Sequence, residues 1–354
     1  MNKLLIGDIS FKKLLPLLII LDVWLFAAHA QGADLTGCRP QLEKSLCYSA
    51  PIDHWTFNTY DVIGSLKLYQ NRECRPMPEK IRQTLLSIYD SYPPEIQQAF
   101  CEIRRLFVVT GNLSYGALTD YYFDVGTVKI TQGLAGHHFS GKPTGYIMEV
   151  SEQNRFKSES ASDYMTRVLQ ARFADRASSS IDLPVAQYET PFGENGALAT
   201  TIVHEIGHML GRAQKVTSTY FLPLSESPWS EITFRLENGN YRLIHAPPGY
   251  QDRASSKALV VNDVSTTFDL FEKSGTATLY GAANPQEDLA ESFMLFFYGN
   301  LKWKVKGKDV FDLQAELTSN PVFREKSEIL RKLMGFPEPF SLKNRKSVSG
   351  DLGV

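Results

Sequence analysis

His204-Glu205-Ile206-Gly207-His208 is the stretch that decides the fold, because it places two imidazoles four positions apart with a carboxylate between them. In an α-helix, positions i and i+4 lie on one face. His204 and His208 can therefore bind one metal ion together. Glu205, rotated about 100° around the helix axis, can reach a water molecule on that metal without being a ligand. The pattern predicts half of a zinc hydrolase site.

The residues around this motif favour a helix over 196–211. Gly211 suits a helix C-terminus, since glycine adopts the left-handed cap conformation at low cost. Apolar side chains recur at intervals of three and four, namely Leu198, Ile202, Ile206 and Met209. This spacing is an amphipathic helical period. The motif is therefore expected late in a helix whose apolar stripe is buried.

Catalytic zinc normally has three protein ligands and an open position for water, so a third ligand is needed. In the metzincin pattern a third histidine lies six residues after the second. This chain has the expected Gly211 but carries Gln214 at the ligand position, and an amide is a poor substitute for imidazole on zinc. Gln214 therefore argues against the metzincin alternative.

A glutamate on a second helix is the other route to a third ligand. The sequence predicts that this helix starts at Pro285, with acidic residues in its first turn and an apolar run after Ser292. Glu287 and Glu291 share one face of it. We assign Glu287 to the metal and Glu291 to the free N–H of a metal-bound histidine, whose ring it is expected to hold in the ligating tautomer. The reverse assignment is the alternative.

In these two blocks the chain resembles the gluzincins, and in particular the family of the anthrax toxin lethal factor catalytic domain. Besides the His-Glu-x-x-His motif, the matching residues are Tyr280, Gly281, Asn284, Glu287, Ala290, Glu291 and Phe293. The resemblance implies a zincin fold and one zinc ion per chain, held by His204, His208 and Glu287. It also implies that Tyr280 faces the metal and stabilises an oxyanion. The spacer between the blocks is longer than the family pattern.

These residues together predict a peptide hydrolase, an endopeptidase by preference, whose partner is a peptide or protein substrate. Glu205 is expected to be the general base for a zinc-bound water, and Tyr280 to donate a hydrogen bond to the oxyanion. His245 is a weaker second donor. The adjacent His137 and His138 are a weak second metal site, because neighbouring side chains alternate in direction. The alternative function is an exported binding or cell-envelope protein that keeps a zincin fold without turnover.

The order of predicted elements favours an α+β, zincin-type fold with a small mixed sheet. Helices are expected over 76–92, 94–104, 159–174 and 324–334, and strands over 105–110, 125–131 and 146–150. Segment 181–188 contains Pro184 and is expected to be an edge strand or loop that pairs with an extended peptide. An Asn-Gly turn within 231–246 predicts a β-hairpin inserted into the catalytic domain.

The N-terminus predicts export. Lysines precede a short apolar run, and Ala28-His29-Ala30 fits the small-x-small cleavage rule, so a signal peptide is expected to be cleaved after Ala30 and to leave a secreted or periplasmic protein. The run is too short for a stable membrane span. Residues 35–38 also match a lipoprotein box, so a lipid anchor at Cys38 is an alternative. The expected units are the signal peptide 1–30, a cysteine-containing helical region 31–104, a catalytic domain 105–337 and a flexible tail 338–354.

The cysteine content and the net charge limit the kinds of cross-link and partner that we expect for this protein. The chain has four cysteines, namely Cys38, Cys47, Cys74 and Cys101. In an exported protein they predict two disulfides, with three possible pairings. The 354 residues include 37 Lys and Arg against 39 Asp and Glu, which gives a net charge of −2. This balance, without a basic tract, argues against a nucleic-acid partner. The oligomeric state stays open.

Overall fold

The structure is a computed structural model, and it describes residues 38–51, 62–111, 116–133, 136–141, 143–155, 195–213, 234–237, 240–243, 275–276, 278, 280–281, 284–297, 302–305, 308–312 and 319–334. Several features expected from the sequence lie outside the described residues: the signal peptide, the helix over 159–174, segment 181–188, Gln214, His245, the tail 338–354 and the side chains of His137 and His138.

The architecture is α+β, built on a small mixed sheet with the strand order β1-β2-β6-β3. These strands are β1 (Leu46–Ser49), β2 (Ile103–Val109), β6 (Pro143–Ser151) and β3 (Ala117–Phe123). β1, β2 and β6 run parallel, whereas β3 pairs antiparallel with β6. The central strands are almost fully buried from Leu106 to Val109 and from Gly145 to Ser151, as expected for strands covered on both faces.

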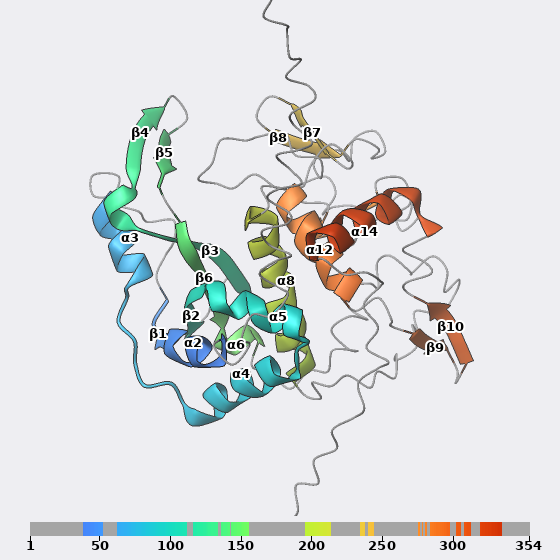
Figure 1. Ribbon diagram of the computed structural model, residues 1–354, viewed down its shortest axis with the longest axis horizontal. Coiled ribbons are helices and arrows are strands. Elements are labelled where there is room, and N and C mark those ends of the chain that lie inside the picture. The colour runs from blue at the N-terminus through green and yellow to red at the C-terminus, as the bar shows by residue number, and fades with distance from the viewer. Residues whose placement is uncertain are drawn as a thin grey trace, which may run out of the picture.

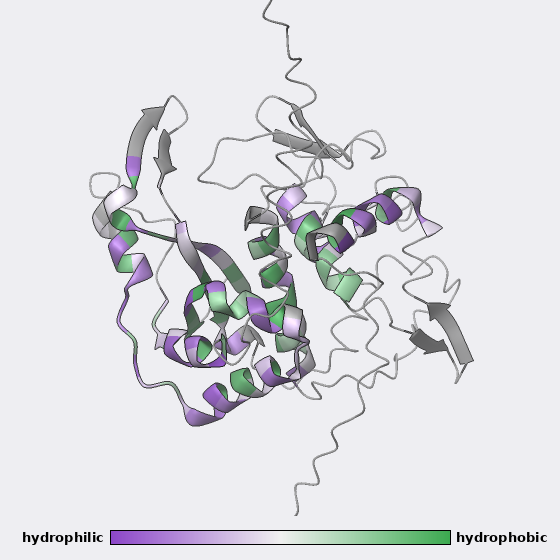
Figure 2. Cartoon of the chain, in the orientation of Figure 1, coloured by the Kyte–Doolittle hydropathy of each residue, from purple (hydrophilic) through white to green (hydrophobic). Residues whose placement is uncertain are grey.

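The helices pack on this sheet or on one another. They are α2 (Cys38–Ser45), α3 (Val62–Gln70), α4 (Glu79–Ser91), α5 (Pro94–Ala99), α6 (Glu152–Arg155), α8 (Gly196–Ala213), α12 (Pro285–Phe297) and α14 (Pro321–Met334). α8 contacts β3, α12 packs on α8, and α14 packs on α12 (Figure 1). Hydrophobic residues gather on α8 and on the strands behind it (Figure 2). The core therefore runs from the sheet through α8 to α12.

Three two-stranded sheets lie apart from the main sheet. They pair β4 (Lys129–Gly133) with β5 (Gly136–Ser140), β7 (Phe234–Glu237) with β8 (Asn240–Leu243), and β9 (Lys302–Val305) with β10 (Lys308–Asp312). In the second of them Glu237 faces Asn240, so two residues, Asn238 and Gly239, connect the strands. This is the hairpin that the Asn-Gly turn predicted.

Several element boundaries differ from the sequence prediction. The helix expected over 76–92 begins at Glu79, because Pro76 and Pro78 disfavour a helical conformation in the residues before them. The helix over 94–104 ends at Ala99, and after a 3₁₀ turn Ile103 already pairs with β6. Burial of Ile103 in the sheet outweighs its local helical pattern.

The strand expected over 125–131 was also wrong in its first half. Val125–Thr127 form a 3₁₀ turn, because the Asp124 side chain accepts a hydrogen bond from the Gly126 N–H at 3.0 Å. A short polar side chain that caps its own backbone in this way favours a turn over a strand. Only from Lys129 onward does the segment become β4.

Two disulfides link the N-terminal elements to the sheet. Cys38 pairs with Cys101, which joins α2 to the turn before β2, and Cys47 pairs with Cys74, which joins β1 to the segment after α3. The structure thus selects one of the three possible pairings. The sulfur of Cys38 is bonded to Cys101 and is not free to carry a lipid thioether. Two disulfides fit an extracellular location, since such bonds persist in oxidising compartments.

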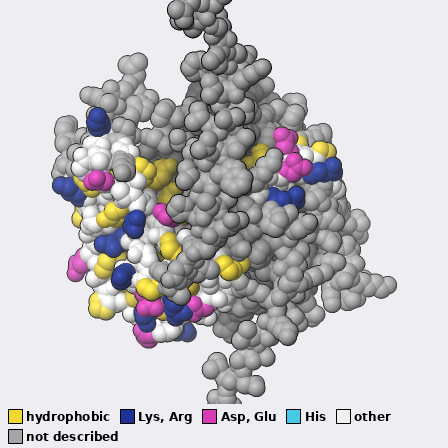
Figure 3. Space-filling view, viewed as in Figure 1, with side chains coloured by type: hydrophobic (Ala, Val, Ile, Leu, Met, Phe, Trp, Pro, Cys, Tyr) yellow, Lys and Arg dark blue, Asp and Glu magenta, His cyan; other side chains and the backbone are white. Residues whose placement is uncertain are grey.

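Two observations describe hydropathy along the described helices and charge on one face of the molecule. None of the helices in the described ranges combines the length and the hydropathy that a bilayer crossing requires. Lys and Arg side chains alternate with Asp and Glu over the described part of the face seen in Figure 3.

Candidate metal centre

α8 carries three of the predicted site residues and is fixed from the sheet side. Its apolar stripe is buried as the spacing predicted, and the helix continues past Gly211 to Ala213. Two buried tyrosines bind its backbone. The Tyr92 hydroxyl donates to the Ala199 carbonyl at 2.6 Å, and the Tyr146 hydroxyl donates to the Met209 carbonyl at 3.2 Å. Both ends of the helix are therefore positioned by side chains that the fold has already buried.

α12 carries Glu287 in its first turn. Asn284 caps the helix, since its side-chain oxygen accepts a hydrogen bond from the Glu287 N–H at 2.9 Å, and its carbonyl accepts the first helical bond from Asp288. Pro285 occupies the first helical position, where its missing N–H costs nothing. The cap fixes the backbone of Glu287 and so the point from which its carboxylate extends.

Gly207, inside the His-Glu-x-x-His motif, lets the two helices approach closely. A Cβ atom at this position would lie 2.9 Å from the Ala290 Cα and 3.3 Å from the Ala290 carbonyl oxygen. Both neighbours are backbone atoms of α12 and cannot turn aside as a side chain would. Glycine here is what allows Glu287 to come within reach of the two histidines.

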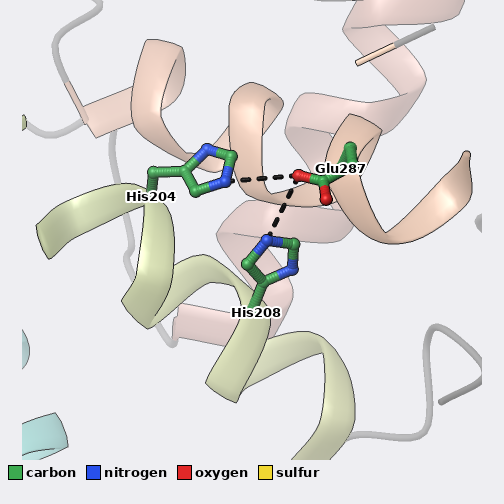
Figure 4. A group of neighbouring side chains, drawn as sticks. All are labelled: His204, His208 and Glu287. Carbon is green, nitrogen blue, oxygen red and sulfur yellow. Dashed lines mark ion pairs between the residues drawn. The ribbon is translucent and has the colours of Figure 1, made fainter. Parts of the chain in front are cut away.

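His204, His208 and Glu287 converge on one point (Figure 4). The Nε2 atoms of His204 and His208 each lie 3.3 Å from Oε2 of Glu287. Two atoms bonded to one tetrahedral zinc ion at about 2.0–2.1 Å are themselves about 3.3 Å apart. Oε2 of Glu287 is buried and makes no well-formed hydrogen bond. Two imidazoles and a carboxylate are also a donor set that zinc accepts. These residues fit a zinc ion.

Contacts between Glu287 and the histidines shift the pKa of Glu287 and of His204 in opposite directions. Burial acts to raise the pKa of Glu287, but the two imidazoles beside it outweigh burial and hold that pKa well below its ordinary value. Burial likewise acts to lower the pKa of His204, but its contacts with Glu287 and Glu291 outweigh burial and raise it. Glu287 is therefore an anion at neutral pH, which is the form that binds a cation.

Glu291 lies behind His204 and not with the three converging atoms. Its Oε1 is 2.7 Å from Nδ1 of His204, on the side of the ring opposite Nε2, although the N–H does not point straight at the oxygen. Its Oε2 accepts a hydrogen bond from the Thr278 hydroxyl at 2.5 Å. Of the two glutamates, Glu287 faces both histidines and Glu291 faces only the outer nitrogen of one. This geometry matches the first of the two assignments considered from the sequence.

Tyr280 lies at the edge of the centre, in a turn that is tied to Glu291. The Gly281 N–H donates to the Thr278 hydroxyl at 3.0 Å, which closes the turn around Tyr280. The Tyr280 ring lies 5.9 Å from the His204 ring, and the residue is 50% exposed. Desolvation of its hydroxyl, and then the negative charge of Glu287, raise the pKa of Tyr280 far above its ordinary value. The phenol therefore remains a hydrogen-bond donor at neutral pH.

Glu205 is buried between α8 and the sheet. It is 4% exposed, and its Oε2 accepts a hydrogen bond from the Thr119 hydroxyl of β3 at 2.7 Å. Its position next to His204 on the same helix keeps it close to the converging nitrogens without joining them.

A buried ion pair supports α12 from behind. Lys326 of α14 places its Nζ 2.6 Å from Oδ2 of Asp288 and donates to the Gly275 carbonyl at 2.7 Å. Both charged side chains are fully buried. Gly275 has φ +63°, and a Cβ there would lie 2.5 Å from the Val322 side chain, so the segment can pass α14 only as glycine. Lys326 thus joins α14, α12 and the segment that leads to Tyr280.

Comparisons with protein-family models, with curated proteins and with solved structures found no significant match.

All six site residues predicted from the sequence come together within the described chain. Three supporting residues were missed: Thr119, Thr278 and Lys326. Thr119 could have been noticed, because it lies on the face of β3 that also presents Tyr121 and Phe123. An apolar residue is expected at such a position. A hydroxyl at such a position calls for a buried partner. Thr278 and Lys326 left no comparable signal.

Proposed function

We propose that this protein is an exported zinc-dependent peptide hydrolase, of the endopeptidase kind, with a gluzincin-type site on a zincin fold. One observation carries the proposal: the Nε2 atoms of His204 and His208 both lie at 3.3 Å from a buried carboxylate oxygen of Glu287. That spacing suits a tetrahedral ion better than direct hydrogen bonding, for which N-to-O distances of about 2.7–2.9 Å are usual in charged pairs.

The chemistry proposed for the site assigns each residue one task. When bound, zinc lowers the pKa of a water ligand toward about 7 and polarises a carbonyl oxygen. Glu205 takes the proton of the attacking water and later delivers it to the leaving amine. Tyr280 donates its hydroxyl hydrogen to the oxyanion that develops on the scissile carbonyl, and its raised pKa keeps that hydrogen in place. Glu291 fixes the orientation of the His204 ring.

The direct test separates metal binding from turnover. The mature protein and its Glu205→Gln variant are analysed for zinc by elemental analysis, and both are incubated with a peptide library whose products are read by mass spectrometry. The proposal expects about one zinc per chain in both proteins and cleavage by the wild type alone. A mature protein without zinc after gentle purification would contradict the proposal. Zinc binding with library cleavage that Glu205→Gln leaves unchanged would favour the binding protein considered above.

Export is the second part of the proposal. It is supported by the two disulfides, which need an oxidising compartment, and by the apolar N-terminus with its small-x-small cleavage site. The mature chain is expected to begin at Gln31, which N-terminal sequencing of the exported protein determines. A chain that begins at Cys38 with a blocked terminus would instead indicate lipoprotein processing.

A further inference from the structure

We propose that Thr119 is a positioning residue for Glu205, and that its hydroxyl holds the Glu205 carboxylate in the orientation that a general base needs. This inference rests on the proposed function and extends it to a residue on the central sheet. Thr119 lies on β3, far from α8 in sequence, and is not one of the three candidate metal ligands.

The contact that carries the inference is short and buried. Thr119 is 1% exposed and Glu205 is 4% exposed. The Thr119 Oγ1 lies 2.7 Å from Oε2 of Glu205 and 3.3 Å from the Glu205 carbonyl oxygen. A threonine hydroxyl has a single hydrogen to donate. The shorter contact is the stronger of the two, so the Thr119 hydroxyl donates its hydrogen to Oε2.

The hydrogen bond to Oε2 limits the orientations open to the Glu205 carboxylate. A carboxylate oxygen accepts hydrogen bonds, and the Thr119 hydroxyl reaches this one from β3. The same bond fixes the rotamer of Glu205 against β3, so that Oε1 keeps one position through the proton transfer.

A purely structural role for Thr119 makes a different prediction. Thr119 pairs with Met148 across β3 and β6, and threonine is a favourable strand residue, so its methyl group and backbone can stabilise the sheet without any effect on Glu205. That role depends on shape and strand propensity, which valine supplies as well as threonine. The positioning role depends on the hydroxyl, which serine supplies and valine does not.

The experiment compares Thr119→Val with Thr119→Ser in the full mature protein loaded with zinc. Because a misplaced catalytic group commonly costs about 10- to 100-fold in rate, Thr119→Val is expected to lower kcat about 10-fold or more, with KM and zinc content unchanged. Thr119→Ser is expected to recover most of the wild-type kcat. Thr201→Val is the matched control, since Thr201 is a buried threonine of α8 whose hydroxyl bonds to the Ala197 carbonyl at 2.9 Å; it is expected to leave kcat within about 2-fold.

A second pair keeps the test valid if Thr119→Val fails to fold. Thr119→Ser and Thr119→Ala both lack the methyl group and differ in the hydroxyl alone. The Ala variant is expected to have about 10-fold lower kcat than the Ser variant. In the Glu205→Gln background, the Ser and Ala variants are expected to have equal residual rates, since Thr119 acts through the carboxylate. Equal kcat for Ser and Ala with Glu205 present would overturn the proposal, as would a difference that persists in Glu205→Gln.

A readout that needs no turnover separates this inference from the proposed function. Acetohydroxamate binds zinc and gives up a proton to a nearby base, so its affinity, measured by calorimetry on the zinc-loaded protein, reports on Glu205. Thr119→Val and Thr119→Ala are expected to weaken this binding several-fold, while Thr119→Ser is not. If the wild type cleaves no peptide but this pattern holds, the proposed function fails and the Thr119 inference stands. If the wild type cleaves peptides and the three variants bind acetohydroxamate equally, the Thr119 inference is wrong.

Discussion

α8 and α12 contribute to one candidate metal centre, but different interactions hold them in place. α8 is fixed on its sheet side by an apolar stripe and by tyrosine hydroxyls that bind its own carbonyls. α12 also packs apolar residues against α8, yet its outer side depends on ionised and polar groups, with the buried pair of Asp288 and Lys326 at the centre. When one apolar contact is removed, the fold loses only part of the stability that the packing provides. When one member of a buried charge network is removed, its partner stays buried and unpaired, which destabilises the fold strongly.

The largest expected effect comes from breaking the buried ion pair between Asp288 and Lys326. Lys326→Met keeps much of the side-chain volume but leaves Asp288 buried without its cation, so the free energy of unfolding should fall by about 3–5 kcal/mol. Chemical denaturation measures this loss. Zinc affinity, measured by competition with a chelator, should fall as well, since Asp288 adjoins Glu287. Arg82→Met is the control: its ion pairs with Glu43 and Glu79 are exposed and should contribute about 1 kcal/mol or less. Equal losses in the two variants would contradict this interpretation of α12.

The second largest effect is expected from removal of the Cys38–Cys101 disulfide, which should leave the candidate metal centre intact. Replacement of Cys38 and Cys101 by serine opens a loop with a sequence separation of 63 and should lower the free energy of unfolding by about 2–4 kcal/mol. Zinc affinity should stay within about 2-fold of wild type, because neither α2 nor the turn before β2 carries a residue of the candidate centre. The same denaturation and chelator assays apply. A loss of zinc affinity as large as that of Lys326→Met would mean that the disulfide supports the centre as strongly as the Asp288–Lys326 pair does.

The third prediction tests the contact between the two helices. Gly207→Ala places a methyl group against the α12 backbone and should cost about 1–3 kcal/mol of stability through overpacking. It should also weaken zinc binding, because α12 must retreat with Glu287. Gly126→Ala is the control, since a Cβ there meets only the Asp124 side chain at 3.4 Å. Chelator competition that shows equal zinc affinity in both variants would mean that the helices can adjust without moving the ligands.

The smallest expected effect concerns the turn around Tyr280. Thr278→Val removes the hydroxyl that binds Glu291 and accepts from Gly281, so it should cost about 1 kcal/mol and reduce zinc affinity by less than 10-fold. Thr84→Val is the control, because the Thr84 hydroxyl bonds to the Lys80 carbonyl on the exposed face of α4. If Thr278→Val binds zinc as wild type does, the orientation of His204 does not depend on this turn.

The sequence predicted the parts of the centre that local spacing encodes. The i and i+4 pair, the apolar period of α8 and the helix start at Pro285 are each contained in one short segment. The pairing of α8 with α12 needed the resemblance to a known family, because nothing local relates His208 to Glu287. The supporting contacts also join positions that are distant in sequence: Lys326 and Gly275 are 51 positions apart, and Thr119 and Glu205 are 86 apart.

The sheet was harder to predict for a related reason. β3 was missed because its hydropathy contradicts its orientation: Leu118 is partly exposed whereas Thr119 is buried. Thr119 is buried because it has a partner in Glu205, which a single-strand pattern does not reveal. In the same way Ile103 continues a helical pattern but joins β2, since pairing with β6 buries it. Tertiary partners overrode local preference at both positions.

The two disulfides are nested, with the Cys47 to Cys74 bridge inside the span closed by Cys38 and Cys101. All four cysteines also precede the three residues proposed to bind the metal. If the protein is exported from its N-terminus onward, as proposed, both bridges can form before His204 has left the export channel. The disulfide-bonded N-terminal region, with β1 and β2, would then fold before α8 and α12. The segment that carries the candidate centre contains no cysteine that could form a wrong disulfide.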